Sequence, residues 1–262
     1  MIQHVLATWR YRHFWLSLVH LDLRNRYRRS VLGIGWSLLH PLAMTVVFCI
    51  AFGGILGSQD WRSFAPKLLV GLAIWDFMKS SIILGCDSFI RGEAYIRQCP
   101  LPMSIYSLRI VLGTFIHFLI ALALVVVSLV VLTGTPNALY ALPTIVPTIA
   151  MLSVFCWSIA TLGAFAHAYF HDTKHLIEVV SQLLFFLTPI MYDAKLLEGK
   201  GLGWVVEINP VAHFLVLIGQ PLLNGKNLEP EQYLFAGGLT VALFGLACGA
   251  MAWLQKRLIF QL

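Results

Sequence analysis

Charged side chains are scarce in this chain, because Asp, Glu, Lys and Arg make up only 11% of its 262 residues while apolar residues make up 59%. A soluble domain of this size needs more charge to solvate its surface. The composition therefore excludes an ordinary soluble protein and indicates an integral membrane protein.

Two further absences exclude classes of function. The five cysteines are scattered and form no CxxC pair, so neither a disulfide framework nor a cysteine-based zinc site is expected. No GxxxxGK[ST] phosphate-binding loop is present, because Gly199-Lys200 and Gly225-Lys226 lack the upstream glycine and the following Ser or Thr. The chain is therefore not expected to hydrolyse ATP by that route or to carry a cofactor of its own.

What the chain does contain is a series of long apolar runs. About 20 apolar residues span a hydrocarbon core roughly 30 Å thick. Residues 31–262 are therefore predicted to form one all-α integral membrane domain with six transmembrane helices. The predicted spans are Val31–Leu56, Lys67–Ile90, Ser104–Thr133, Leu142–Tyr169, His175–Met191 and Tyr233–Trp253.

The basic residues predict the orientation. If the N-terminus is cytoplasmic, twelve of the 18 Lys and Arg residues fall in cytoplasmic segments, five fall outside, and Lys79 lies within a span. Short Lys/Arg-rich loops stay on the cytoplasmic side, so both termini are expected there. Nucleic-acid binding is the competing explanation of a basic chain. It is not expected here, because the charge is divided among loops beside apolar spans.

The cytoplasmic residues 1–30 are predicted to include an amphipathic helix in the membrane interface. One helical face is polar, formed by His13, Ser17, His20, Arg24 and Arg28, and most of the remainder is apolar. Such a helix turns its basic face toward lipid phosphates and the cytosol. Asp22 falls among the apolar residues, and we expect Arg26 to neutralise it. Plain topological anchoring is the alternative interpretation.

The segment Arg91–Arg109 separates the second and third apolar runs. Its prolines, Pro100 and Pro102, cannot continue a helix, so a cytoplasmic hairpin tip is predicted. A short helix there offers an aromatic and an aliphatic anchor with a charged rim, which suits a groove on a partner protein. These residues are Glu93, Tyr95, Ile96 and Arg97. A solvated tip without a partner is the alternative.

The segment between the fifth and sixth runs is apolar but repeatedly interrupted by proline and glycine. Irregular backbone at membrane depth persists only where protein or a water-filled path surrounds it. Short re-entrant helices at Val205–Ile208 and Val211–Leu223 are therefore predicted on the outer side. A peripheral outer loop is the alternative.

Two polar groupings are candidate sites. Asp76 and Lys79 lie three residues apart in the second run, where ionisable groups are functional candidates. Together with nearby aromatic residues they define a possible translocation path. An internal ion pair explains the charged residues equally well, and ordinary packing explains the aromatic residues better. The predicted path residues are Trp75, Asp76, Phe77, Lys79 and Tyr192.

The second grouping is histidine-rich. The four-residue spacing of His167, His171 and His175 would place them on one face if they shared a helix. A membrane-embedded metal enzyme is one interpretation of such a face. A polar helix end at the membrane surface is the simpler one, and no metal site is predicted.

Five blocks of the sequence, in family order, resemble permeases of the type-2 ABC exporter family in its polysaccharide and O-antigen branch. They include a basic entry to the first span, a Trp-Asp-Phe signature in the second, and a Thr-Pro-Ile-x-Tyr element. The blocks are Arg26–Pro41, Gly71–Phe77, Tyr95–Pro102, Phe170–Tyr192, and Asn209-Pro210 with Pro221–Leu223. Two positions depart from the pattern: His171 and Gly219 stand at or near positions where family members often carry arginine.

The resemblance implies a homodimeric permease in the bacterial inner membrane, working with two copies of a separate ATPase that binds ATP and Mg. The implied cargo is a polysaccharide on a polyprenyl pyrophosphate lipid, moved from the cytoplasmic to the periplasmic side. Another cargo, such as a teichoic-acid-like polymer, a glycolipid or a drug, remains an alternative.

The resemblance also implies roles for particular residues. The hairpin-tip residues Glu93, Tyr95, Ile96 and Arg97 would contact the ATPase, with a second contact at His171, Asp172 and Lys174. The interface residues Arg24, Arg28 and Arg29 would meet the ATPase or the lipid pyrophosphate.

Overall fold

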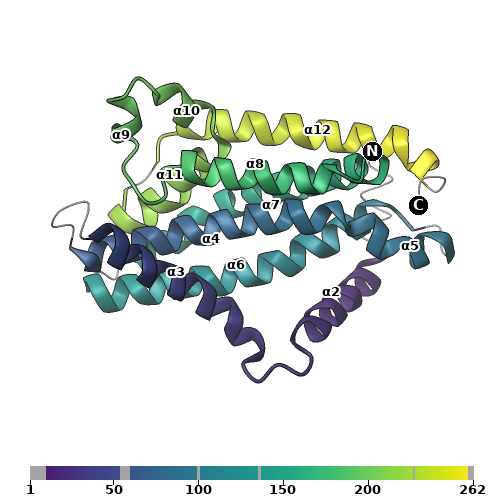
Figure 1. The fold of residues 1–262 in the computed structure, drawn as a ribbon, viewed down its shortest axis with the longest axis horizontal. Coiled ribbons are helices and arrows are strands. Elements are labelled where there is room, and N and C mark those ends of the chain that lie inside the picture. Colours follow the sequence, from purple (N-terminus) through teal and green to yellow (C-terminus); the bar gives the residue numbers. More distant parts are fainter. Residues whose placement is uncertain (1–9, 54–59, 99–100, 135–136, 227, 259–262) are drawn as a thin grey trace.

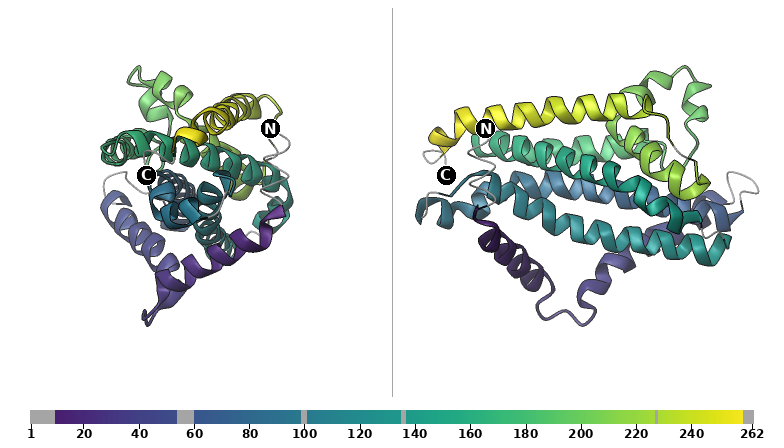
Figure 2. Two further views of the ribbon diagram at one scale, coloured as in Figure 1. Left: turned by 90° about the vertical axis from the view of Figure 1, so that its right-hand side faces the viewer. Right: turned by 180° about the vertical axis from the view of Figure 1, so that it is seen from behind.

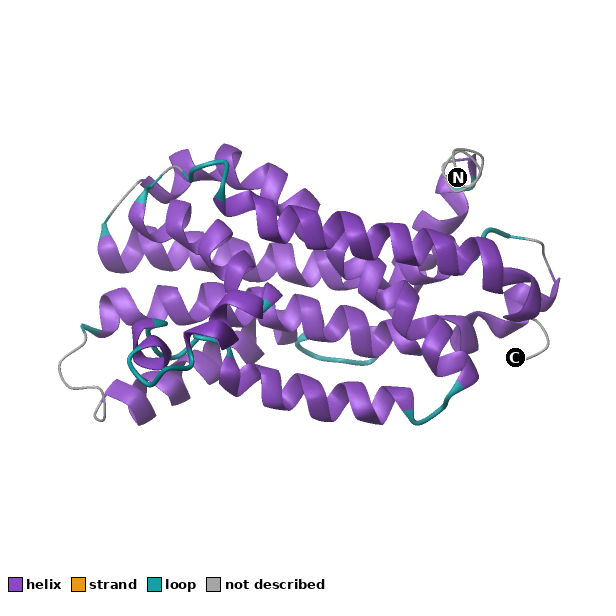
Figure 3. Cartoon of the chain, turned by 90° about the horizontal axis from the view of Figure 1, so that it is seen from above, coloured by secondary structure: helices purple, strands orange, loops and turns teal. Residues whose placement is uncertain are grey.

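A computed structural model describes residues 10–53, 60–98, 101–134, 137–226 and 228–258. Every regular element within these ranges is helical (Figure 3). The elements are α2 (Arg12–Tyr27), the 3₁₀ turn η1 (Gly33–Gly35), α3 (Trp36–Gly53), α4 (Trp61–Cys86), α5 (Ser88–Gln98), α6 (Ser104–Thr133), α7 (Asn137–Tyr169), α8 (Thr173–Leu187), α9 (Lys195–Glu198), α10 (Gly203–Ile208), α11 (Pro210–Asn224) and α12 (Gln232–Leu258).

Long helices run lengthwise beside one another around α4, the most buried of them (Figures 1 and 2). Five described segments, those of α3, α4, α6, α7 and α12, are long and apolar enough to cross a membrane. The helices α4 and α7 approach closely at Gly85, where an added Cβ would lie 2.6 Å from the Cβ of Ala160. Small residues permit such approach between membrane helices, where packing rather than water exclusion drives association.

Different elements lie at the two ends of the bundle. At one end, here called the α5 end, Leu258 of α12 is buried with Phe89 and Ile96 of α5. The ring of Phe14 in α2 meets Tyr95 there edge-on, with ring centroids 6.1 Å apart. Both ends of the described chain thus lie beside α5. The opposite end, here called the α10 end, carries α9, α10 and α11 (Figure 1).

The helices α2 and α3 form a V along one side of the bundle (Figure 1). Leu18 and Val19 of α2 are buried, whereas His13, Ser17, His20 and Arg24 are exposed. Leu16 and Leu21 are exposed as well, so the bundle covers only part of the apolar side of this helix. The helix ends at Tyr27, so the predicted polar face stops short of Arg28, which is the C-terminal cap. The turn into α3 uses left-handed backbone at Arg29 (φ 68°) and Gly33 (φ 52°).

The expected neutralisation of Asp22 by Arg26 is wrong. Asp22 pairs with Arg109 of α6 instead, with its Oδ2 2.9 Å from Arg109 Nε, and the arginine side chain is only 10% exposed. A guanidinium that is largely buried needs such a partner. The pair therefore holds α2 against the bundle.

All six predicted apolar runs contain helices, and α6 has the predicted bounds. The helix α4 ends at Cys86 rather than Ile90, because the chain turns at Asp87 and starts α5. The fifth run forms α8, which at 15 residues is shorter than the five long spans. The short helices α10 and α11 fall where the sequence predicts them, and α9 is an addition.

Candidate functional site

The helix α5 is amphipathic and lies against the end of the bundle. Its buried residues follow helical spacing, whereas Ile90, Ala94, Tyr95 and Arg97 are exposed. The buried residues are Ser88, Phe89, Gly92 and Ile96. Ile96 is only 7% exposed and packs within this chain, so its side chain does not face outward as the predicted partner anchor. Tyr95, at 37% exposure, remains on the outer face.

Gly92 permits the close packing of α5 on α6. A Cβ added at Gly92 would lie 2.5 Å from Cδ1 of Tyr106, a side chain that is itself fully buried. On the other side of α5, Arg97 Nε donates to Glu93 Oε1 over 2.8 Å, one helical turn apart. The helix thus presents an ordered polar edge next to Tyr95.

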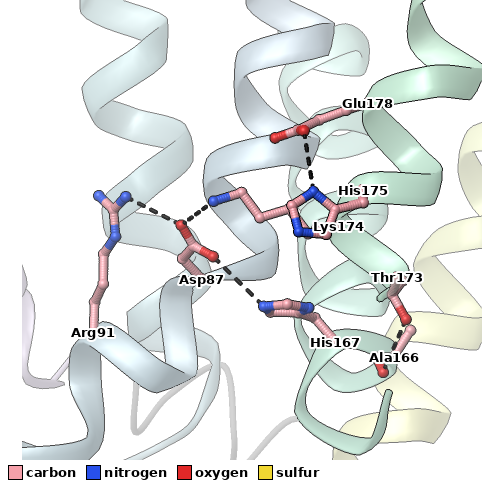
Figure 4. Close-up of polar contacts among 8 residues, drawn as sticks. All are labelled: Asp87, Arg91, Ala166, His167, Thr173, Lys174, His175 and Glu178. Carbon is pink, nitrogen blue, oxygen red and sulfur yellow. Dashed lines mark hydrogen bonds and ion pairs between the residues drawn. The ribbon is translucent and has the colours of Figure 1, made fainter. Parts of the chain in front are cut away.

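Asp87, at the junction of α4 and α5, gathers three basic side chains (Figure 4). Its Oδ2 accepts from Arg91 Nη2 at 3.1 Å and from Lys174 Nζ at 2.9 Å. Its Oδ1 lies 3.6 Å from Nε2 of His167. Asp87 is 15% exposed, so these partners offset most of its lost hydration. The cluster joins α4 and α5 to α7 and α8, and sequence reasoning missed it.

The predicted second contact is only partly free to meet a partner. Lys174 is engaged by Asp87, whereas His171 and Asp172 are exposed in the turn between α7 and α8. In the sequence, the signal for the Asp87 cluster is the spacing of four residues between Asp87 and Arg91, which allows an ion pair on one helix.

The three histidines do not share one helix. The helix α7 ends at Tyr169, His171 lies in the turn, and His175 is on α8, 3.6 Å from Glu178 (Figure 4). Within the described ranges, no group of three or more His, Cys, Asp or Glu side chains is arranged to hold a metal ion. His167 is buried beside Asp87, whereas His171 and His175 are exposed in and after the turn between α7 and α8.

The α10 end brings three of the motif blocks together. Asn209 caps α11 by accepting from the backbone N–H of Val211, and its amide donates to Thr188 Oγ1 over 2.8 Å. Ile190 packs on Gly71 of α4, where an added Cβ would lie 2.6 Å from its Cγ2. Thr188, Asn209 and Ile190 are buried, so this junction is part of the protein core.

Beside that junction lies a cavity of about 550 Å³, lined by residues of α4, α6, α10 and α11 and by Pro189, Ile190, Tyr192, Asp193 and Ala194. Tyr192 lines it, and so does Gly219, where an added Cβ would lie at ordinary contact distance, 3.8 Å, from side-chain atoms of Leu223 and Val70. Lys67 and Asp193 form an ion pair among the lining residues. This cavity is the candidate site at the α10 end.

The remaining predicted path residues divide between a second cavity and the core. Asp76 does not pair with Lys79: its Oδ2 lies 3.6 Å from Nδ1 of His40. Trp75 packs on Phe185, and Phe77 stacks on Phe118 with ring centroids 5.0 Å apart. Trp75 is therefore a packing residue, whereas Asp76, Phe77 and Lys79 line a cavity on the side of the bundle.

A bundle of long apolar helices with polar clusters at its α5 end defines a multi-pass integral membrane protein. Comparison with known families matches residues 14–220 to the family described as ABC-2 type transporter. The chain therefore belongs to the ABC-2 type transporter family. It is a membrane subunit of a transporter and not an enzyme.

Curated relatives cover most of the chain. It is 27% identical over 232 residues to an O-antigen export system permease protein RfbA of Klebsiella pneumoniae, with 88% of each chain covered. A second RfbA of that organism is 26% identical over the same length. RfbA of Myxococcus xanthus is 24% identical over 248 residues, with 94% of each chain covered.

Proposed function

We propose that this protein is the permease subunit of an ATP-driven exporter of lipid-linked, O-antigen-like polysaccharide. The observation that carries the proposal is the family match, together with relatives named for O-antigen export over 88% or more of their length. The permease acts as a homodimer with two copies of an ATPase subunit, which binds ATP and Mg. It moves polyprenyl-pyrophosphate-linked glycan from the cytoplasmic to the periplasmic side of the inner membrane.

The path of the chain supports six membrane crossings. The helix α7 ends at the cluster around Asp87, and α12 ends beside α5, whereas α10 and α11 lie at the opposite end. The chain must therefore return between them, and α8 with Thr188 to Met191 makes that passage. The α5 end is cytoplasmic because the basic segments gather there. Both termini are then cytoplasmic.

The contact with the ATPase is formed by the exposed face of α5. Tyr95, Glu93 and Arg97 supply its aromatic and charged groups, and His171 and Asp172 lie in a second exposed turn. Ile96 and Lys174 act behind this surface, because they bind α5 and the α7–α8 turn to the rest of the permease. A force on α5 therefore reaches α4 and α8.

The exposed arginines of the α2 segment face the cytoplasmic leaflet. Arg24 lies on the polar side of α2, and Arg28 and Arg29 lie in the turn that follows it. Each basic group near an anionic leaflet contributes about 1 kcal/mol of attraction. These three residues are placed to hold membrane lipid and the pyrophosphate of the cargo at the surface.

Co-purification with complementation tests the function. Affinity-purified permease is expected to retain a stoichiometric ATPase. Deletion of the permease gene is expected to remove long-chain glycan from the cell surface until that gene is restored. A retained ATPase with unchanged surface glycan would contradict the assignment of the cargo. It would point instead to a teichoic-acid-like polymer, a glycolipid or a drug.

Thiol labelling tests whether the outer segment re-enters the membrane. In a cysteine-free background, cysteines replacing Trp204 and Ile208 are expected to react with a membrane-impermeant maleimide far more slowly than one replacing Lys200. Trp204 and Ile208 are 59% and 64% exposed on the protein, so only lipid or a second subunit can protect them. Val211 is uninformative because the protein itself buries it. Equally rapid labelling at all three sites would indicate a peripheral loop.

A further inference from the structure

The side of the bundle holds a cavity of about 390 Å³ between the end of α2, the start of α3, α4 and α6. Four basic or imidazole side chains line it, Arg26, His40, Lys79 and His117, against one carboxylate, Asp76. That carboxylate lies 3.6 Å from His40. Arg26 and Lys79 therefore give the lining two fixed positive charges against one carboxylate.

Lys79 places this charge within the membrane-spanning region. It lies seven residues before the end of α4, which corresponds to about 10 Å along the helix. Within the described part of the chain, neither Lys79 nor Arg26 forms an ion pair with a carboxylate. An ammonium group at this depth without such a partner is costly, and such groups mark ligand pathways.

Hydrogen bonds hold the wall of the cavity in place. Ser37 Oγ and Tyr27 Oη lie 2.8 Å apart, and Ser37 Oγ lies 2.8 Å from Nδ1 of His117. These contacts join the ends of α2 and α3 to α6. Polar groups that are already positioned lose little freedom when a ligand binds.

We propose that this cavity binds the phosphate of a lipid headgroup that enters sideways from the membrane. Lys79 and Arg26 provide the charge. The hydrogen bonds among Tyr27, Ser37 and His117 use two hydrogens, so one of the two hydroxyl groups can donate to a phosphate oxygen when Nδ1 of His117 carries a proton. The proposal rests on the proposed function, since it supplies an intramembrane site for the diphosphate of the cargo lipid. An ordinary phosphatidyl lipid offers the same chemistry.

Lipid retention by the purified permease–ATPase complex tests the cavity. The complex is reconstituted in phosphatidylcholine nanodiscs with either undecaprenyl diphosphate or phosphatidylglycerol as the probe, and the bound lipid is counted by native mass spectrometry. Lys79→Gln and Arg26→Gln are each expected to weaken binding about tenfold, because each removes a charged donor. Lys79→Arg keeps the charge and is expected to retain the lipid.

The control is Lys226→Gln, which removes an equal charge at an exposed site beyond α11 and is expected to change nothing. Preference for the diphosphate lipid assigns the cavity to the cargo, and equal binding of phosphatidylglycerol assigns it to membrane lipid. Unchanged retention in both glutamine variants overturns the proposal. Because complementation by the unaltered chain tests the function separately, that result would leave the function intact.

Discussion

Combining Tyr95→Ala with Arg97→Glu is expected to abolish glycan export and cargo-stimulated ATPase activity while the permease stays folded in the membrane. Both side chains lie on the exposed face of α5, so their loss leaves the buried face of the helix unchanged. Aromatic and arginine anchors dominate the energy of protein interfaces. The measurements are export in cells, ATPase activity in proteoliposomes, and the amount of ATPase that co-purifies.

One control variant identifies the contact that is lost. Phe14→Ala removes the edge-to-face partner of Tyr95 without altering α5 and is expected to retain the ATPase. If it uncouples export as strongly as the double variant, the α2–α5 contact is responsible rather than the ATPase contact. Arg109→Glu is unsuitable as a control, because it would place two carboxylates together at the buried pair with Asp22.

Asp87→Asn is expected to uncouple export from ATP hydrolysis while the ATPase remains bound. The substitution preserves size but removes the carboxylate that joins Arg91, Lys174 and His167. Arg91 and Lys174 then face each other without a counter-charge, which should lower stability by about 2 kcal/mol. The movement of α5 would no longer be transmitted to the α7–α8 turn.

The measurements for this variant are the thermal unfolding temperature of the purified permease and the ratio of export to ATPase activity. Glu93→Gln is the matched control, since it removes a carboxylate from an exposed pair on the same helix. Such exposed pairs contribute between about 0 and 1 kcal/mol. An Asp87→Asn protein with normal unfolding and export would show that the cluster has no mechanical role.

The helices were largely predictable from the sequence because membrane spans depend on local apolarity and length. The bounds of α6 match the prediction, and α11 begins and ends within one residue of it. Pairings between distant segments were not predictable. Asp22 meets Arg109, and Asp87 meets Lys174, each across 87 positions in the chain, and nothing local distinguishes these partners from nearer ones.

The contacts of the candidate site were likewise not predictable from the sequence. The sequence indicated a short helix that carries Glu93, Tyr95, Ile96 and Arg97, but not which face of it would be buried. Ile96 looked like an anchor for a partner, yet Met103, Tyr106 and Leu258 share its buried cluster. The lateral cavity depends on the turn at Arg29 and Gly33, which brings Arg26 and Tyr27 beside α4 and α6. Only the tertiary structure shows that these segments lie together.

The continuity of α4 has a geometric consequence. Its 26 residues form one helix from the cavity at the α10 end to Asp87, a length of about 39 Å. A tilt of about 5° around its α10 end would displace the Asp87 end by about 3.4 Å and Gly71 by about 1.3 Å. Gly71 already touches Ile190 with no room for a methyl group. A displacement of α4 at Asp87 therefore separates or compresses the contact between Gly71 and Ile190 near the other end. The conformations of the two ends of the bundle are then coupled through this helix.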